Sequence, residues 1–248
     1  MDADSERRRD RTRAAETRAA DVIAEGVWDA EPREIPGRLC AVAVDLLPVV
    51  GASVALHSDG LPVRLSASSE RAARLAEIQA TLGEGPCQYA AGLRAPVQAR
   101  DLTAGPDARR WPLFAQQATA AGIQAAYSMP LGIDTVCVGT LDLYSDTPGE
   151  LTGRDLHTAL LVAGVMTVAL MALPRGEGNG GEGDEPWLSG LATDQDEVYQ
   201  AVGMTMAQLG SDADEALARL RAHAFADSRT VLEVARDVVA HRMRLHRD

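Results

Sequence analysis

Residues that could carry out chemistry are few and widely spaced in this sequence. The three cysteines, Cys40, Cys87 and Cys137, are separated by 47 and 50 residues, so they form neither a CxxC pair nor a closed disulfide framework. We expect small buried thiols in a reducing compartment. His241 and His246 are five residues apart, which places them about 140° apart around a helix. This is a poor arrangement for a metal, and we expect no metal site.

Catalytic motifs are also missing from the sequence. It contains no GxSxG, HExxH or Walker-type run. All 24 basic residues are arginines, and the lack of lysine excludes a Schiff-base lysine, a P-loop lysine and a receiver-domain switch lysine. We therefore expect no catalytic residues and a protein that is not an enzyme. A deep pocket with converging titratable groups would argue for an enzyme instead.

The arginines are unevenly distributed along an acidic chain. A net charge of −12 disfavours a broad polyanion-binding surface but allows a local basic patch. From Trp187 to the end there are seven arginines and ten acidic residues, whereas from Ala216 onward there are seven and four. The acidic residues are expected to cluster at helix starts, where they favour the positive end of the helix dipole. The residues that could form a basic face are Arg219, Arg221, Arg229, Arg236, Arg242, Arg244 and Arg247.

The 248 residues suffice for one large domain or two small ones. The clearest boundary is the stretch 174–186, which is rich in glycine and acidic residues and has a proline at each end. Such a composition sustains neither helix nor strand and predicts a mobile linker. We expect an N-terminal helix for dimerisation within 1–34, a first domain at 35–173 and a second domain at 187–248.

The first domain shows the hydrophobic periodicity of an α+β fold. Strand patterns and helix patterns alternate in an order that predicts an antiparallel sheet flanked by helices. A hairpin with Asp-Gly in its connection joins the first two strands. The expected strands are 52–57, 61–67, 96–99, 122–131 and 136–144, and the expected helices are 5–29, 36–47, 70–80, 108–121 and 153–173, with a short helix up to residue 91.

One segment resembles a membrane span. Residues 156–173 contain no Asp, Glu, Lys or Arg, but they include a histidine and two threonines and only just reach the length needed to cross a hydrocarbon core. We expect a helix buried in protein and partly covered by a second copy of the chain, so that it and the N-terminal helix form a homodimer. The N-terminus lacks the apolar core of a signal peptide, which predicts a cytoplasmic protein with no membrane partner.

The last 62 residues predict three short amphipathic helices. The first runs from near Asp194 to Leu209, the second covers 212–225, and Asp227 or Ser228 caps the third. Three such helices make a small bundle. Tyr199 and Phe225 could stack on RNA bases, although we expect Phe225 in the core.

The first domain contains three distinctive phrases, Leu82-Gly-Glu-Gly-Pro-Cys87, Pro96-Val-Gln-Ala-Arg-Asp-Leu102 and Val138-Gly-Thr-Leu-Asp-Leu-Tyr144. These phrases resemble those of a GAF domain. The resemblance covers about 35–173 and implies a sensor fold with a small-molecule ligand that the sequence does not identify. Because other GAF domains bind cyclic nucleotides, tetrapyrroles or haem, Cys87 and His57 could be read as chromophore or haem ligands. A packed thiol and an ordinary strand-end histidine are the simpler interpretation.

The C-terminal region resembles an ANTAR domain, an RNA-binding antitermination module, over about 188–245. The resemblance is carried by 198–206, 211–221 and 228–235. It implies RNA contacts by Ala201, Gly203, Met204, Arg221 and Arg229. Ala201 and Met206 also suit packing, Gly203 also suits close helix contact, and the two arginines could instead pair with acids of the bundle. Val202 stands where the family often has lysine.

Together these resemblances predict an RNA-binding regulator of transcription antitermination. The ANTAR bundle would bind paired hairpins in nascent mRNA, and since two hairpins invite two bundles, a homodimer is expected. The GAF domain would sense a ligand or partner. The alternative is a ligand-sensing or protein-interaction module that uses the bundle mainly to dimerise, and a DNA-binding regulator is a third option.

Overall fold

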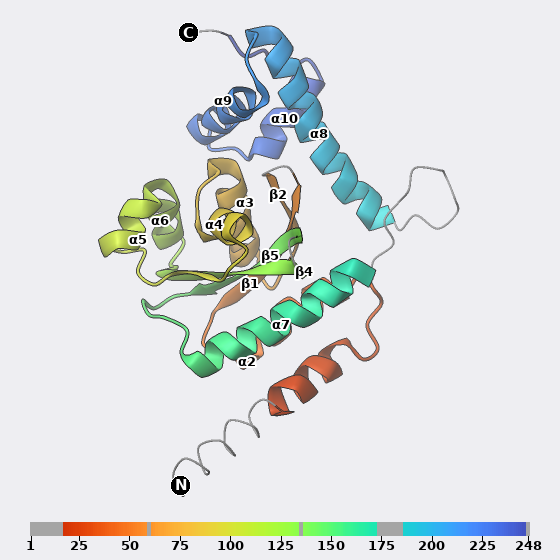
Figure 1. The fold of residues 1–248 in the computed structure, drawn as a ribbon. Coiled ribbons are helices and arrows are strands. Elements are labelled where there is room, and N and C mark those ends of the chain that lie inside the picture. The colour runs from red at the N-terminus through yellow and green to blue at the C-terminus, as the bar shows by residue number, and fades with distance from the viewer. Residues whose placement is uncertain (1–16, 59–60, 134–135, 173–185, 247–248) are drawn as a thin grey trace, which may run out of the picture.

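The computed structural model describes residues 17–58, 61–133, 136–172 and 186–246. It has an N-terminal domain with a five-stranded sheet between two layers of helices, and a C-terminal bundle of three helices seated on one end of that domain (Figure 1). The predicted α+β sheet domain and three-helix bundle are therefore confirmed. Residues 1–16 of the expected N-terminal helix and nearly all of the expected linker, 173–185, lie outside the described residues.

The sheet is antiparallel throughout, in the order β2-β1-β5-β4-β3. Gly139 lies in β5 where β1 approaches closely, because a Cβ atom there would collide with the carbonyl oxygen of Ala55. This contact explains the glycine of the Val138–Tyr144 phrase. The strands are β1 (Gly51–Ser58), β2 (Leu61–Ala67), β3 (Val97–Ala99), β4 (Ala125–Ile133) and β5 (Val136–Ser145).

Each face of the sheet has its own hydrophobic core. One face packs against α2 (Ile35–Leu46), α7 (Gly153–Ala172) and the helical residues 17–27. The other is covered by α3 (Glu70–Leu82), α4 (Pro86–Leu93), α5 (Gly105–Arg110) and α6 (Pro112–Ala120). The single helix expected at 108–121 is wrong: the chain leaves helical geometry at Trp111, because the following proline has no amide hydrogen to continue the ladder.

Helix α7 packs with one side on the sheet and presents the other outward. It is long and apolar enough to cross a membrane, yet a third of its most apolar 18-residue window is buried within the protein. Its inner side contacts β4 and α2. Leu160, Gly164 and Val168, spaced four residues apart, form an exposed apolar stripe on the outer side, where Val168 keeps 66% of its surface accessible. One side of α7 thus packs in the core, while its outer side is not covered by the described residues.

The bundle consists of α8 (Pro186–Leu209), α9 (Ala213–Ala226) and α10 (Val231–Val239). The start expected near Asp194 is wrong, because α8 begins at Pro186, and proline is well suited to the first turn of a helix. The cap expected at Asp227 or Ser228 is also wrong. Thr230 caps α10 in a capping box with Glu233, and Ser228 adopts a left-handed φ of 55° in the preceding turn.

On the sheet face beneath α3 and α4, polar side chains form a row across the three central strands. Ser53, Asp142 and Ser128 lie directly opposite one another in the register of β1, β5 and β4. Ser128 donates a hydrogen bond to the Asp142 carboxyl group, and Thr140 donates a second one of 3.3 Å. Burial raises the pKa of Asp142 to about 7, even though these two hydrogen bonds lower it. We call Ser53, Ser128, Thr140, Asp142 and Tyr144 the polar stripe.

His57 ends the polar stripe near the edge of the sheet, with its Nε2 atom 3.3 Å from the Thr140 hydroxyl. Burial lowers the pKa of His57 to about 4, so the ring is neutral at physiological pH. Burial therefore shifts the pKa values of Asp142 and of the neighbouring His57 in opposite directions.

The stripe predicts a specific pH dependence of stability. Between pH 4 and 7 the folded protein retains a proton on Asp142 that the unfolded chain has lost, so this group makes the free energy of unfolding fall as pH rises. Asp142→Asn should remove a slope of up to about 1.4 kcal/mol per pH unit. His57 acts with the opposite sign, losing stability as pH falls from 6.5 towards 4, but it does so in both proteins and cancels in the difference. Urea unfolding at four pH values measures this difference, and parallel curves for the two proteins would contradict the prediction.

Candidate nucleic-acid interface

Helix α8 presents the first three candidate RNA contacts in different environments. Ala201 is fully buried in the bundle core, where it packs and offers no surface to RNA. Met204 is half-buried against the same core. Gly203 is exposed, and no described atom lies within 4 Å of the Cβ atom that another residue would place there. Close helix packing among the described residues therefore does not account for this glycine.

Val202 lies in the bundle core with 8% of its surface accessible. The position at which the resembling family often has lysine is thus used for apolar packing here. A lysine ammonium group at this point would have to extend past the neighbouring helix to reach water.

Arg229 lies in the turn before α10 and is held within the bundle. Its Nη2 atom donates to the Asp237 carboxylate at 2.7 Å and to the Glu233 carbonyl oxygen at 2.9 Å. Arg242 contacts the same carboxylate at 2.7 Å. The hydrogen bond from Arg229 and, to a smaller extent, the one from Arg242 lower the pKa of Asp237. Arg229 therefore pairs with an acid of the bundle, while 30% of its side chain stays accessible.

Other arginines of the expected basic face are also paired. Arg236 contacts Glu197 of α8 at 2.7 Å, and Arg219 lies 3.5 Å from Glu215 one turn earlier. The expectation that acids are confined to helix starts is wrong for Glu197 and Asp237, which lie in the bodies of their helices. The bundle therefore neutralises much of its positive charge internally.

Arg221 contacts the N-terminal domain and is only partly accessible to solvent. Gly83, with a left-handed φ of 66°, ends α3, and a Cβ atom there would lie 2.6 Å from Nη1 of Arg221. The Nε and Nη2 atoms of Arg221 are buried without a hydrogen-bond partner. Burial lowers the pKa of this guanidinium group. The arginine expected to contact RNA is thus covered by α3 and carries unsatisfied donors.

A second contact joins the same end of α3 to α10. The backbone N–H of Val231 donates to the Thr81 hydroxyl at 3.3 Å. Together, Arg221 on Gly83 and Val231 on Thr81 form what we call the α3–bundle contact. The sequence does not predict this contact, because Gly83 is typical of a turn and nothing in the local pattern identifies its partner in a distant segment.

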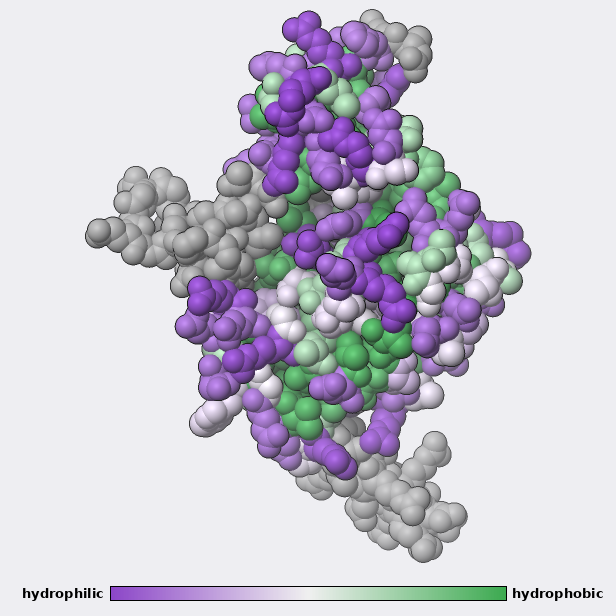
Figure 2. Space-filling view, turned by 180° about the vertical axis from the view of Figure 1, so that it is seen from behind, coloured by the Kyte–Doolittle hydropathy of each residue, from purple (hydrophilic) through white to green (hydrophobic). Residues whose placement is uncertain are grey.

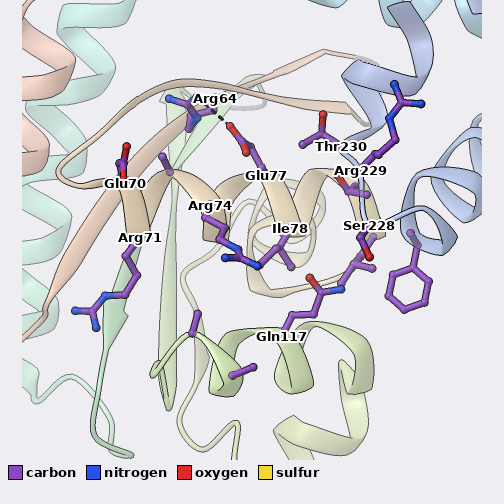
Figure 3. Close-up of a pocket in the computed structure, with 16 residues that line it drawn as sticks. Arg64, Glu70, Arg71, Arg74, Glu77, Ile78, Gln117, Ser228, Arg229 and Thr230 are labelled. Carbon is purple, nitrogen blue, oxygen red and sulfur yellow. Dashed lines mark hydrogen bonds and ion pairs between the residues drawn. The ribbon is translucent and has the colours of Figure 1, made fainter. Parts of the chain in front are cut away.

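Beside the α3–bundle contact lies a cleft of about 1050 Å³. It is lined by α3 and α6 on one side and by the turn between α9 and α10 on the other (Figure 3). Seen from behind, hydrophilic residues spread over the bundle and the surface just below it (Figure 2). Phe225 lines this interdomain cleft with 42% of its surface accessible, so the expectation that it is a core residue is wrong.

Two of the three cysteines show the packing expected of small buried thiols. Cys40 and Cys87 are buried, and burial raises the pKa of the Cys87 thiol well above its usual value. Cys137 is only half-buried, contrary to expectation. Among the residues that the structure describes, no group of three or more His, Cys, Asp or Glu side chains could hold a metal ion.

Comparisons with solved structures support the sheet domain as a known fold. The GAF domain of a phosphoenolpyruvate-protein phosphotransferase from Coxiella burnetii matches with a TM-score of 0.51 and 12% identity, covering 64% of this chain and 94% of that chain. Free methionine-R-sulfoxide reductase from Neisseria meningitidis, solved with its substrate, matches with a TM-score of 0.49 and 15% identity over 65% of this chain and 91% of that chain. At 12% identity the likeness to the Coxiella burnetii domain concerns the fold alone.

Sequence profiles assign both domains. The profile of the GAF domain matches residues 29–171, and the profile of the ANTAR domain matches residues 190–239. None of the curated proteins matches this chain. Since the first profile spans more than half of the chain, the chain belongs to the GAF domain family, and it carries an ANTAR domain at its C-terminal end.

Proposed function

We propose that the protein is a cytoplasmic RNA-binding regulator of transcription antitermination. GAF and ANTAR domains are sensory and regulatory modules, and an ANTAR domain implies RNA binding. The observation that carries the proposal is the match of the ANTAR profile to α8–α10. In this function the bundle binds paired hairpins in nascent mRNA and keeps the downstream terminator from forming. Hairpin loops present splayed bases that a small protein can read.

Two features of the bundle support RNA contacts. Gly203 leaves open space on the outer side of α8, where a nucleic-acid backbone can approach closely. Arg229 keeps part of its fork accessible although it pairs with Asp237. An arginine already oriented by a carboxylate can donate its remaining N–H groups to phosphate or to a base edge.

The α3–bundle contact supports a way for the GAF domain to control the bundle. Arg221 can reach RNA only when it leaves Gly83, so the arrangement with the bundle docked on α3 is the state of lower RNA affinity. A ligand or partner that binds the GAF domain better in one of the two states shifts the balance between them.

A titration tests the function directly. Labelled paired-hairpin RNA, unpaired RNA and duplex DNA are each added to the full-length protein at two salt concentrations. Preference for the paired hairpins supports the proposal, and preference for duplex DNA contradicts it. Equal weak binding of all three would favour a second candidate, a ligand-sensing module whose bundle mainly dimerises. The internal ion pairs of Arg229 and Arg236 favour that candidate.

Opening the α3–bundle contact should strengthen RNA binding. Gly83→Met places a side chain where Arg221 now lies, which disfavours the docked state. Gly122→Met is a matched control, because Gly122 has a similar φ of 77° but the nearest atom to its Cβ position is 3.8 Å away. We expect RNA affinity to rise about fivefold or more in the first variant only, a typical size for coupling between sites. Equal affinities in the two variants would argue against control through this contact.

Replacing Arg221 should stabilise the protein and weaken its binding of RNA. Arg221→Met removes buried unsatisfied N–H groups while keeping the apolar stem, so the free energy of unfolding should rise by about 1 kcal/mol. RNA affinity should fall by roughly 1–3 kcal/mol if the residue reads a base edge. Thermal unfolding and RNA titration of the same protein measure both. Arg219→Met, which removes an exposed arginine, is the control, and unchanged RNA affinity in Arg221→Met would remove Arg221 from the RNA site.

We also propose that the protein is a homodimer formed through α7 and the N-terminal helix. The apolar stripe of Leu160, Gly164 and Val168, together with Trp28 at 88% accessibility, offers a surface that a second copy can cover. A dimer would present two bundles to two hairpins.

The dimer is tested by charge placed on the stripe. Leu160→Glu combined with Val168→Glu should convert the protein to a monomer at micromolar concentration in analytical ultracentrifugation, because two carboxylates would be buried at the interface. Leu93→Glu alters an exposed leucine on α4, away from the stripe, and should leave the dimer intact. Sedimentation of the wild-type protein as a monomer would exclude the proposal.

A further inference from the structure

We propose that the interdomain cleft binds a free mononucleotide, which holds the bundle in its docked position. The cleft lies between two domains, a common place for ligand sites, and its volume of about 1050 Å³ can hold a nucleotide. The site is separate from the polar stripe, which lies beneath α3 and α4. Its effect on RNA rests on the proposed function, whereas nucleotide binding itself does not.

The cleft contains positive charge that the protein does not use. Four arginines line it, but Arg64 is paired with Glu77 at 3.0 Å and Arg229 is paired with Asp237. Within the part of the chain that the structure describes, the side chains of Arg71 and Arg74 make neither a hydrogen bond nor an ion pair.

Both unpaired arginines lie on one side of α3, three residues apart. Figure 3 shows the Arg74 side chain extending past Ile78, towards the side of the cleft where Gln117 and Ser228 lie, whereas Arg71 extends the other way along α3. The free guanidinium group of Arg74 suits a phosphate group, to which it can donate a pair of N–H bonds, and Arg71 adds positive charge on the same wall. A single carboxylate, Glu70, remains beside them without an ion pair.

The opposite wall suits the flat part of a nucleotide. Phe225 from α9 lines the cleft with an accessible ring, on which a base can stack. Gln117 from α6 points towards Ser228 across the cleft, so an amide and a hydroxyl group face the same space (Figure 3). These groups can donate to and accept from a base edge. Ile78 and Leu82 make the floor apolar.

The walls belong to different domains, which gives the ligand a regulatory effect. Arg71, Arg74 and Gln117 come from the GAF domain, whereas Phe225 and Ser228 come from the ANTAR bundle. A ligand that touches both walls binds only while the bundle is docked, so it stabilises the docked state. Because Arg221 is covered in that state, nucleotide and RNA should oppose each other's binding to the same extent.

Calorimetric titration of the full-length protein with each of the four ribonucleoside 5′-monophosphates tests the site. At least one should bind the wild-type protein. Arg74→Gln should weaken its binding about tenfold or more, the range for a hydrogen bond to a charged group, and Phe225→Ala should weaken it about fivefold or more. Arg109→Gln, an exposed arginine of α5 outside the cleft, is the matched control and should bind as the wild type does. Both test residues are accessible, so the variants should fold, which far-ultraviolet circular dichroism checks.

The outcomes separate this proposal from its alternatives. Binding of no mononucleotide, or equal binding by Arg74→Gln and the wild type, overturns it. Inorganic phosphate that competes as well as a nucleotide, with Phe225→Ala unaffected, overturns the nucleotide assignment in favour of a plain anion site. If the two variants lose affinity for hairpin RNA while no mononucleotide binds, the cleft is part of the RNA surface and the proposal fails. A wild-type protein that binds nucleotide but no RNA contradicts the proposed function and leaves the cleft site standing.

Discussion

The arrangement of the two domains depends on one costly interaction, the burial of the Arg221 guanidinium group against the end of α3. Two of its nitrogen atoms lie buried without acceptors, and Gly83 is the residue whose missing Cβ leaves room for it. A buried donor without an acceptor typically costs about 1–3 kcal/mol, and a charged one costs more. The hydrogen bond from Val231 to Thr81 offsets part of this cost at the same helix end. The docked state is therefore held by few polar contacts and opposed by the unsatisfied guanidinium group, which suits a contact that opens in the proposed function.

The same helix connects this contact to the interior of the GAF domain. Gln79, one turn before Gly83 on α3, is fully buried and accepts a hydrogen bond of 3.0 Å from the Cys87 backbone. Its amide nitrogen lies 3.5 Å from the Tyr144 hydroxyl, which in turn lies 3.0 Å from the Ser53 hydroxyl in the polar stripe. A change in the stripe that moved Gln79 would move the end of α3 and with it the seat of Arg221. Physical continuity of this kind supplies a route for coupling, and variants of Gln79 would measure how much coupling it carries.

The sequence predicted the elements well because their signals are local. Alternating apolar residues and capping residues determine where the strands and most helices begin and end, as α3 shows, which begins at Glu70 as expected behind the capping side chain of Ser69. It failed where the decisive partner is distant in the chain. The ion pair of Arg236 with Glu197 spans 39 residues, and the contact of Val231 with Thr81 spans 150. A helical pattern indicates which side chains share a face, but whether a second domain covers that face depends on tertiary packing. Phe225 was misplaced for this reason, because it is exposed, and nothing in the sequence indicated that the end of α3 contacts Arg221.

The charge of the bundle follows from the same packing. In the proposed function, an acidic protein can keep its arginines oriented for RNA by pairing them with its own carboxylates, as Arg229 and Arg242 are paired with Asp237. Each such pair lowers the net positive field, so long-range attraction to RNA is weak and affinity has to come from close, geometrically defined contacts. A bundle of this kind would bind little RNA nonspecifically, because nonspecific binding relies on unpaired charge and several of its arginines are paired with carboxylates. An arginine that the GAF domain can cover or release then changes affinity in large proportion, since few other free guanidinium groups of the bundle remain to compensate for its loss.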